Sequence, residues 1–329
     1  MRTGLRNRIF NIKDQADFWE IVLKVVNYQF EKNTVYHDFI AGLGKDRDAV
    51  KALADIPFLP VEFFRNQKIV TGDLPVEMIF ESSGTTGVAP GKHFVNDLSL
   101  YEESFLKTFR LFYGDPGEYL IAALLPSYAE REGSSLVYMA DKLIKRSTHP
   151  LSGFYKGNIE DLINAIKKAK EENRKILLLG VSFALLDLAE KQSPDLSGVI
   201  VMETGGMKGR RQELTREELH TILKEKFNVP LIHSEYGMTE LMSQAYSKGE
   251  GIFYCPPWMK VVIRDPQDPL SLYTETGRTG GINIIDLANI NSCSFIATGD
   301  LGRLHEDGGF EILGRFDSSD IRGCNLLIE

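Results

Sequence analysis

The chain of 329 residues carries 38 Lys and Arg against 46 Asp and Glu, which gives a formal net charge of −8. This balance argues against a general nucleic-acid or anionic-membrane binder, because such proteins displace counterions with a net basic face. Hydrophobic residues at 43% and charged residues at 26% are ordinary for a globular protein that buries a large core.

Residues 1–75 are expected to form a mainly helical region packed on the core. Within residues 17–33, the apolar side chains recur at helical spacing, namely Phe18, Ile21, Val22, Val25 and Val26. The following segment 56–64 (IPFLPVEFF) is apolar and interrupted by proline. We predict that it is an extended connector on the surface of the core.

Residues 76–250 show short apolar strands that alternate with amphipathic helices. Strands are predicted at 118–127, 175–180, 198–206 and 229–237. Helices are predicted at 134–146, 158–173, 181–191 and 216–228. The alternation implies βαβ units in a mainly parallel sheet, which is an α/β fold. Ligands bind such sheets at the loops that follow the carboxyl ends of the strands.

Residues 251–329 lose the helical pattern and are expected to form a β-rich subdomain with a mobile C-terminal tail. Strand and turn patterns cover 259–265, 280–287, 293–304 and 309–317. A small barrel or an antiparallel sheet would both fit this pattern. We expect the subdomains to share a cleft.

Cysteine usage and apolar runs indicate the compartment. Cys255, Cys293 and Cys324 are too few and too widely spaced for a zinc cluster or a disulfide framework, and free thiols suit a reducing cytoplasm. The basic N-terminus lacks the apolar run of a signal peptide, and no apolar stretch approaches the roughly 20 residues that span a bilayer. We expect a cytoplasmic protein without a transmembrane segment.

The segment Ser82–Gly87 (SSGTTG) follows a short apolar stretch at residues 78–80. It does not match the Walker pattern. Its glycines nevertheless allow backbone N–H groups to turn inward, and its hydroxyls add donors for phosphate oxygens. On its own the segment is more typical of a linker or a turn, with a phosphate loop as the alternative.

Two later motifs carry groups that suit a nucleotide. In His233–Glu240 (HSEYGMTE), the Tyr236 ring can stack on a base, the Thr239 hydroxyl can bind a phosphate and Glu240 can ligate Mg²⁺. A strand end with a buried tyrosine is the simpler interpretation. In Thr298-Gly299-Asp300, the carboxylate can accept hydrogen bonds from ribose hydroxyls, although a lone aspartate is also typical of turns.

A fourth motif, Gly314-Arg315-Phe316-Asp317, completes a set whose order and spacing resemble the adenylate-forming superfamily. That superfamily includes acyl-CoA synthetases and luciferases, and the resemblance spans residues 80–323. Within it, the ending at residues 320–329 (DIRGCNLLIE) and the helical N-terminal region look most like the acyl-protein synthetases of bacterial luminescence operons, a family of long-chain fatty acid–protein ligases.

The resemblance implies ATP and Mg²⁺ as cofactors and gives a role to each matched residue. The residues implied to hold the β- and γ-phosphates are Ser82, Ser83, Gly84, Thr85, Thr86 and Gly87. Those implied to line the adenine and acyl pocket are Glu203, Gly205 and Gly206. Tyr236, with Gly237, is implied to bind the base. Thr239 is implied to bind the α-phosphate, and Glu240 to hold the metal. Those implied at the ribose and the phosphates are Asp300 and Arg315.

The sequence departs from the superfamily pattern at two places. Lys92 lies five residues after Gly87, farther than the lysine of the usual loop, so no role is assigned to it. The usual small C-terminal domain, which supplies a further lysine and part of the coenzyme A surface, is expected to be absent. This expectation draws attention to Cys324 near the end of the sequence.

Cys324 is the candidate acyl acceptor. The resemblance implies that such an enzyme activates a fatty acid, carries the acyl group on its own C-terminal cysteine and delivers it to an acyl reductase; an acyl-carrier protein or coenzyme A would also serve as acceptor. Arg322 would favour the attacking thiolate. A small buried hydrophobe is the alternative for Cys324, and it is the expected role of Cys255 and Cys293.

Two other functions stay open. Ser182, in Gly180-Val181-Ser182-Phe183-Ala184 between a predicted strand and helix, is similar to the nucleophile elbow of an acyl esterase or thioesterase. Such an enzyme needs a downstream acid and histidine, for which Asp300 and His305 have the right order. The protein could also be a nucleotide-binding module without catalytic activity.

Overall fold

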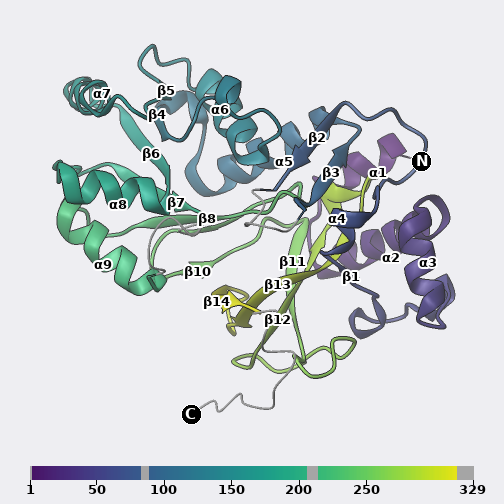
Figure 1. The fold of residues 1–329 in the computed structure, drawn as a ribbon. Coiled ribbons are helices and arrows are strands. Elements are labelled where there is room, and N and C mark those ends of the chain that lie inside the picture. The colour runs from purple at the N-terminus through teal and green to yellow at the C-terminus, as the bar shows by residue number, and fades with distance from the viewer. Residues whose placement is uncertain (1, 83–88, 206–213, 317–329) are drawn as a thin grey trace.

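A six-stranded sheet forms the centre of the α/β part in this computed structural model, which describes residues 2–82, 89–205 and 214–316 (Figure 1). Its parallel strands, in spatial order, are β5 (Gly153–Phe154), β4 (Tyr119–Leu124), β6 (Lys175–Val181), β7 (Ile200–Thr204) and β8 (His233–Tyr236). The antiparallel strand β9 (Ala245–Ser247) closes the edge. The parallel sheet predicted from the sequence is confirmed.

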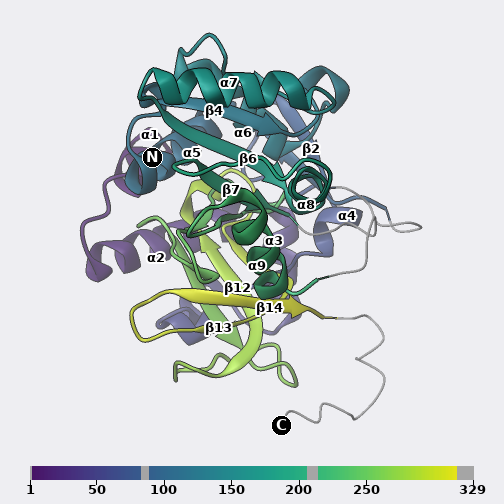
Figure 2. The same ribbon diagram turned by 90° about the vertical axis from the view of Figure 1, so that its left-hand side faces the viewer.

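Helices cover both faces of this sheet (Figures 1 and 2). On one face lie α5 (Leu98–Tyr113) and α6 (Ser135–Ser147). On the other face lie α7 (Ile159–Glu171), α8 (Ser182–Lys191) and α9 (Arg216–Phe227). Every residue of β4 is buried, and its successive side chains enter alternate core clusters, because side chains alternate along a strand. The predicted helices are confirmed to within a few residues, whereas α5 was not predicted.

The β-rich C-terminal part forms a second, antiparallel sheet. Its strands, in spatial order, are β10 (Ile252–Phe253), β14 (Phe310–Arg315), β13 (Phe295–Leu304), β12 (Thr279–Asp286) and β11 (Met259–Arg264). A separate hairpin of β2 (Met78–Glu81) and β3 (Lys92–Val95) flanks the segment that contains SSGTTG. Short 3-10 turns are η1 (Arg47–Ala49), η2 (Leu53–Asp55), η3 (Pro116–Glu118), η4 (Tyr128–Glu130) and η5 (Leu287–Asn289).

Residues 56–64, predicted as an extended connector packed on the core, contain a strand that joins the second sheet. Strand β1 (Leu59–Pro60) pairs in parallel with β13, where Leu59 faces Ile296, and Leu59 is fully buried. The missing N–H of Pro60 is tolerated because the N–H of Val61 donates the ladder bond to the carbonyl of Ala297, at 2.9 Å. Apolar side chains on both sides of the proline then enter the core.

The N-terminal helices are α1 (Arg2–Ile9), α2 (Gln15–Lys32), α3 (Thr34–Gly42) and α4 (Phe63–Asn66). Helix α2 buries the stripe that the sequence predicts, namely Phe18, Ile21, Val22, Val25 and Val26, with Gln29 one turn further. Asp14 caps this helix by accepting a hydrogen bond from the N–H of Asp17 at 2.9 Å. Among the described residues, no helix has both the length and the apolar character that crossing a membrane requires.

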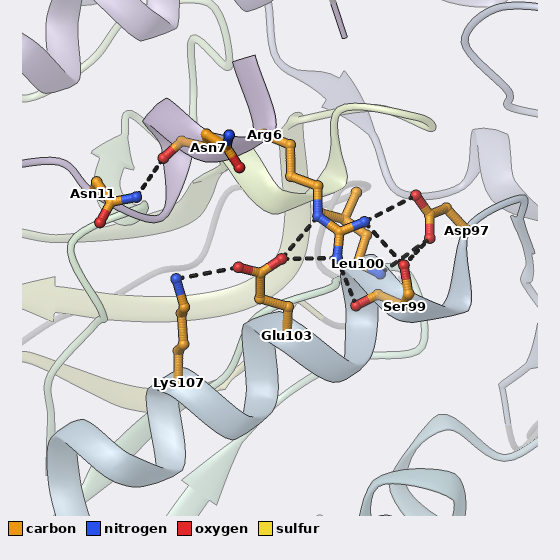
Figure 3. Close-up of polar contacts among 8 residues, drawn as sticks. All are labelled: Arg6, Asn7, Asn11, Asp97, Ser99, Leu100, Glu103 and Lys107. Carbon is orange, nitrogen blue, oxygen red and sulfur yellow. Dashed lines mark hydrogen bonds and ion pairs between the residues drawn. The ribbon is translucent and has the colours of Figure 1, made fainter. Parts of the chain in front are cut away.

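Arg6 ties α1 to the start of α5 (Figure 3). Its guanidinium lies 2.7 Å from the carboxylate of Glu103 and 3.3 Å from that of Asp97, and it donates to the Ser99 hydroxyl at 2.9 Å. Asp97 is also the N-cap of α5, since it accepts from the N–H of Leu100 at 3.2 Å. Charged contacts therefore anchor the N-terminal helices to the α/β part.

Candidate active site

Tyr236 and Asp300 meet between the two sheets. Tyr236 ends β8 at the carboxyl edge of the parallel sheet, and Asp300 lies within β13. The Tyr236 hydroxyl donates a hydrogen bond to Asp300 Oδ2 at 2.8 Å, and both side chains are buried. The Tyr236 ring also makes edge contacts with Phe253 and Phe310, whose ring centroids lie 6.0 and 5.7 Å away. An aromatic ring and a carboxylate are thus held in a fixed relation.

Arg315 completes this end of the site. It is the cross-strand partner of Asp300, and its Nε lies 3.3 Å from Asp300 Oδ1. Burial raises the pKa of Asp300, while the Tyr236 hydroxyl and the Arg315 charge favour the ionised carboxylate. The Arg315 side chain is 70% exposed, so its guanidinium remains accessible to a ligand at the surface.

Glu240 lies against the loop end of the β2–β3 hairpin, beside Ser82 and Gly91. A Cβ added to Gly91 would fall 2.5 Å from Glu240 Oε1 and 3.5 Å from Ser82 Oγ, so the absence of a side chain at Gly91 lets the carboxylate occupy this position. The Ser82 hydroxyl accepts from the N–H of Gly91 at 2.8 Å. Two motifs far apart in sequence are thereby brought together. Ser83, Gly84, Thr85, Thr86 and Gly87 lie outside the described residues, as do Gly206 and Cys324.

The single Glu240 carboxylate is the kind of ligand that Mg²⁺ takes when it is bound together with nucleotide phosphates. Among the described residues, no cluster of three or more His, Cys, Asp or Glu side chains could hold a metal ion by itself. Mg²⁺ in phosphate-transfer sites commonly takes one or two carboxylates and completes its shell with phosphates and water. Burial raises the pKa of Glu240, so a bound cation would favour the ionised form that ligates it.

The end of β7 forms a buried polar cluster around Glu203. Its carboxylate accepts from the Ser182 hydroxyl at 3.0 Å and from Arg216 Nε at 3.4 Å, and His220 Nε2 lies 3.6 Å away. Although burial disfavours the charge, the His220 and Arg216 contacts hold the pKa of Glu203 below its ordinary value. Gly205 follows in the left-handed region with φ of 63°.

Ser182 does not have the surroundings of a hydrolase nucleophile. Its hydroxyl is buried and donates to Glu203 and to the carbonyl of Gly205. Within the described part of the chain, no histidine contacts this hydroxyl, and His305 is paired with Glu311 at 2.6 Å on the β13–β14 turn. The contacts of Ser182 instead hold the ends of β6 and β7 together.

Lys92 lies on the hairpin surface, and the described cysteines are packed in the interior. Lys92 Nζ is 3.5 Å from Glu81 Oε1 on the hairpin surface, and both side chains are about half exposed. Cys293 is buried and Cys255 packs against the core, as expected. Burial raises the pKa of both thiols to about 12, so both stay protonated at neutral pH.

Gly237 is a second glycine that a carboxylate approaches closely. A Cβ there would overlap Glu235 Oε1, so glycine at this position accommodates the buried carboxyl group of Glu235.

Sequence reasoning missed the buried side chains that hold the backbone of the loop after β8, among them His93 and Asn289. Neither belongs to a motif, and both come from distant parts of the chain, so only the folded structure identifies them.

Sequence comparison finds no match, either to a protein-family model or to a curated protein. Structural comparison finds enzymes that form adenylates. 2-Hydroxyisobutyryl-CoA ligase, solved in the postadenylation state with 2-HIB-AMP, matches with a TM-score of 0.62 and 14% identity over 96% of this chain and 68% of that chain. ATP-bound MatB from Rhodopseudomonas palustris matches with a TM-score of 0.54 and 20% identity over 73% of this chain and 48% of its own.

A third match is O-succinylbenzoate coenzyme A synthetase (MenE) from Bacillus subtilis, in complex with ATP and magnesium ion. Its TM-score is 0.51 and its identity 18%, over 72% of this chain and 49% of that chain. The present chain therefore spans about half the length of MatB and MenE. At these identities the comparison shows the fold, and the fold is that of the adenylate-forming enzymes.

Proposed function

We propose that the protein activates a carboxylic acid with ATP to an acyl-adenylate and then transfers the acyl group to a thiol. The observation that carries this proposal is the pairing of Tyr236 with Asp300 in a fold whose solved relatives include ATP-bound enzymes. The contact of Glu240 with Gly91 beside Ser82 supports it, because it places a carboxylate next to the segment proposed to hold phosphates.

In the first step, a carboxylate oxygen of the acid attacks the α-phosphorus of ATP. A new bond forms between this carboxylate oxygen and the α-phosphorus, while the bond between the α-phosphorus and pyrophosphate breaks. Asp300 would accept from the ribose hydroxyls, and the Thr239 hydroxyl would donate to the α-phosphate as charge builds there. Glu240 would hold Mg²⁺, which neutralises phosphate charge when bound.

In the second step, a thiolate attacks the carbonyl carbon of the acyl-adenylate, and AMP leaves. The thiol proton passes to solvent, and a thioester remains. We propose a fatty acid as the substrate and Cys324 as the acceptor thiol, from which an acyl reductase or an acyl-carrier protein would collect the acyl group. The resemblance of residues 320–329, which contain Cys324, to the acyl-protein synthetases supports this finer assignment.

Acid-dependent exchange of pyrophosphate into ATP tests the first step. We expect exchange with at least one member of a panel of carboxylic acids that includes long-chain fatty acids. ATP binding without exchange for any acid would overturn the proposal in favour of a nucleotide-binding module. A Ser182→Ala variant should keep adenylation, whereas an esterase that used Ser182 would lose its activity.

Labelling by radioactive acid tests the second step. A Cys324→Ser variant should still catalyse exchange but should not retain thioester-bound label. The matched control is Cys255→Ser, which removes a thiol whose pKa is raised by burial to about 12 and which should leave labelling intact. Persistent thioester in Cys324→Ser would exclude Cys324 as the acceptor.

A further inference from the structure

Two buried side chains hold the backbone carbonyls of Thr239 and Glu240. His93 Nδ1 lies 2.8 Å from the carbonyl oxygen of Thr239, and Asn289 Nδ2 donates to the carbonyl oxygen of Glu240 at 2.8 Å. His93 comes from β3 and Asn289 from η5, which are nearly 200 residues apart in the sequence. The residues that bear the proposed phosphate ligand and metal ligand are therefore each fixed by a side chain from another part of the chain.

The next residues of the loop are fixed by a third buried group. The Asp286 carboxylate accepts from the N–H groups of Met242 and Ser243 at 2.8 and 2.9 Å, and from the Ser243 hydroxyl at 2.6 Å. It also accepts from the N–H of Ala288 at the start of η5. Asp286 thus joins the loop after Glu240 to the turn that carries Asn289.

The N-terminal region supports the same turn. Gln29 of α2 is fully buried, and its Nε2 lies 3.1 and 3.0 Å from the carbonyl oxygens of Asn289 and Ile290. Its Oε1 accepts from the N–H of Ser294 at 3.0 Å. Since buried hydrogen-bonded networks resist rearrangement, the turn has little freedom to move Asn289.

The proton on His93 is defined by its surroundings. Burial lowers the pKa of His93 to about 4, so the ring is neutral at neutral pH. A carbonyl oxygen only accepts, so the neutral ring must carry its proton on Nδ1 to bond Thr239. The Phe64 ring packs edge-on against the imidazole, with centroids 5.8 Å apart, and restrains its orientation.

We propose that His93 and Asn289 are positioning residues for adenylation. They fix the backbone at Thr239 and Glu240 before ATP and Mg²⁺ bind, so that the hydroxyl and the carboxylate need no rearrangement when the reaction begins. This inference rests on the proposed function, because it takes Thr239 and Glu240 as the groups that act on the nucleotide.

Two substitutions of His93 separate positioning from packing. His93→Phe keeps an aromatic ring beside Phe64 but removes the donor, whereas His93→Asn supplies an amide N–H in place of Nδ1–H. In the exchange assay, we expect His93→Phe to lower kcat by about 10- to 100-fold with a much smaller change in the KM for acid. His93→Asn should recover most of this loss. Asn289→Leu should raise the Mg²⁺ concentration for half-maximal exchange by about tenfold.

The matched control is His149→Phe, which replaces a histidine whose side chain is 6% exposed and whose Nε2 lies 3.2 Å from a carboxylate oxygen of Glu172. It should leave kcat unchanged even where the melting temperature falls. Equal kcat for folded His93→Phe and wild type would overturn the positioning role. So would equal losses in His93→Phe and His93→Asn, because packing alone would explain them.

A measurement on the unmodified protein makes the inference independent of whether variants fold. Nitrogen-15 NMR of the histidine rings should show His93 neutral from pH 5 to 8 with its proton on Nδ1. A proton on Nε2 would overturn the inference. Absence of exchange for every acid in the wild type, together with an intact Nδ1–H signal, would instead refute the proposed function and leave the hydrogen bond established.

Discussion

Tyr236 donates a hydrogen bond to Asp300 at 2.8 Å, and this bond joins the carboxyl edge of the parallel sheet to the antiparallel sheet. The two residues belong to motifs that are 64 positions apart. Both side chains are buried, so the Tyr236 hydroxyl supplies a hydrogen bond that water would otherwise give to the Asp300 carboxylate. Without it, burial would favour the protonated form of Asp300. The contact therefore bears on stability and, in the proposed function, on nucleotide binding.

A Tyr236→Phe substitution should weaken both properties. The buried Asp300 would lose its only uncharged side-chain donor among the described residues, which raises its pKa further and costs about 1 to 3 kcal/mol of unfolding free energy. We expect ATP affinity to fall by about tenfold, because a protonated Asp300 accepts ribose hydrogen bonds less well. Chemical denaturation and calorimetric titration with ATP measure the two effects.

Tyr254→Phe is the matched control for that variant. Tyr254 also donates to an aspartate, Asp307 at 2.6 Å, but the pair lies on the surface. The loss of this surface hydrogen bond should change the unfolding free energy by less than about 0.5 kcal/mol and should not affect ATP binding. Similar effects of both substitutions on ATP binding would argue against a nucleotide role for the Tyr236–Asp300 pair.

Gly91→Ala should impair metal use without unfolding the protein. The added Cβ would overlap Glu240 Oε1, whose distance from the ideal position is 2.5 Å. A flexible carboxylate can rotate away, so we expect little change in the melting temperature. The displaced carboxylate should raise the Mg²⁺ concentration required for exchange by about tenfold. Gly153→Ala, a strand position with open space around its Cβ, should leave the Mg²⁺ dependence unchanged. An unaltered Mg²⁺ dependence in Gly91→Ala would remove Glu240 as the metal ligand.

Arg264→Lys should loosen the strand that carries Asp300. The buried Arg264 guanidinium donates to the carbonyl of Ile282 at 2.8 Å and to that of Thr298 at 2.6 Å. Lysine cannot reproduce this forked geometry, so buried acceptors would lose their donors. We expect a loss of about 2 to 4 kcal/mol of unfolding free energy and weaker ATP binding.

Arg303→Lys is the control that tests whether the loss of unfolding free energy in Arg264→Lys depends on the burial of the arginine. Arg303 bonds Glu311 at 3.0 and 3.1 Å, but the pair is partly exposed, so the change should cost less than about 1 kcal/mol. If Arg264→Lys proved as mild as this control in denaturation, the buried fork would not be what stabilises β13.

The sequence patterns predicted the elements whose burial follows a simple rule. Strand β4 is an apolar run between helices, and α2 carries a regular apolar stripe, so both could be predicted. Strand β1 could not, because its proline argues against pairing until the neighbouring strand is known. His93 and Asn289 could not be identified for a different reason. A buried polar residue is explained by its partners, and those partners are brought close only by the tertiary fold.

Glu235→Gln should change how stability depends on pH. Glu235 is buried in β8 and accepts a hydrogen bond from the Thr204 hydroxyl. Burial raises its pKa from 4.5 to about 7, and the charge of Glu203 adds to the rise. The folded state therefore binds this proton more tightly than the unfolded state. The resulting stability is present below about pH 4.5 and is lost as the pH rises through 7.

The neutral amide of Glu235→Gln keeps an acceptor for Thr204 but has no proton to lose. Relative to this variant, the wild type should lose on the order of 3 kcal/mol of unfolding free energy between pH 4.5 and pH 8. Urea denaturation at pH values across that window measures the difference. If the difference between Glu235→Gln and the wild type stayed constant across that window, Glu235 would be ionised in the folded protein throughout, and its burial would have to be compensated by a contact other than the one with Thr204.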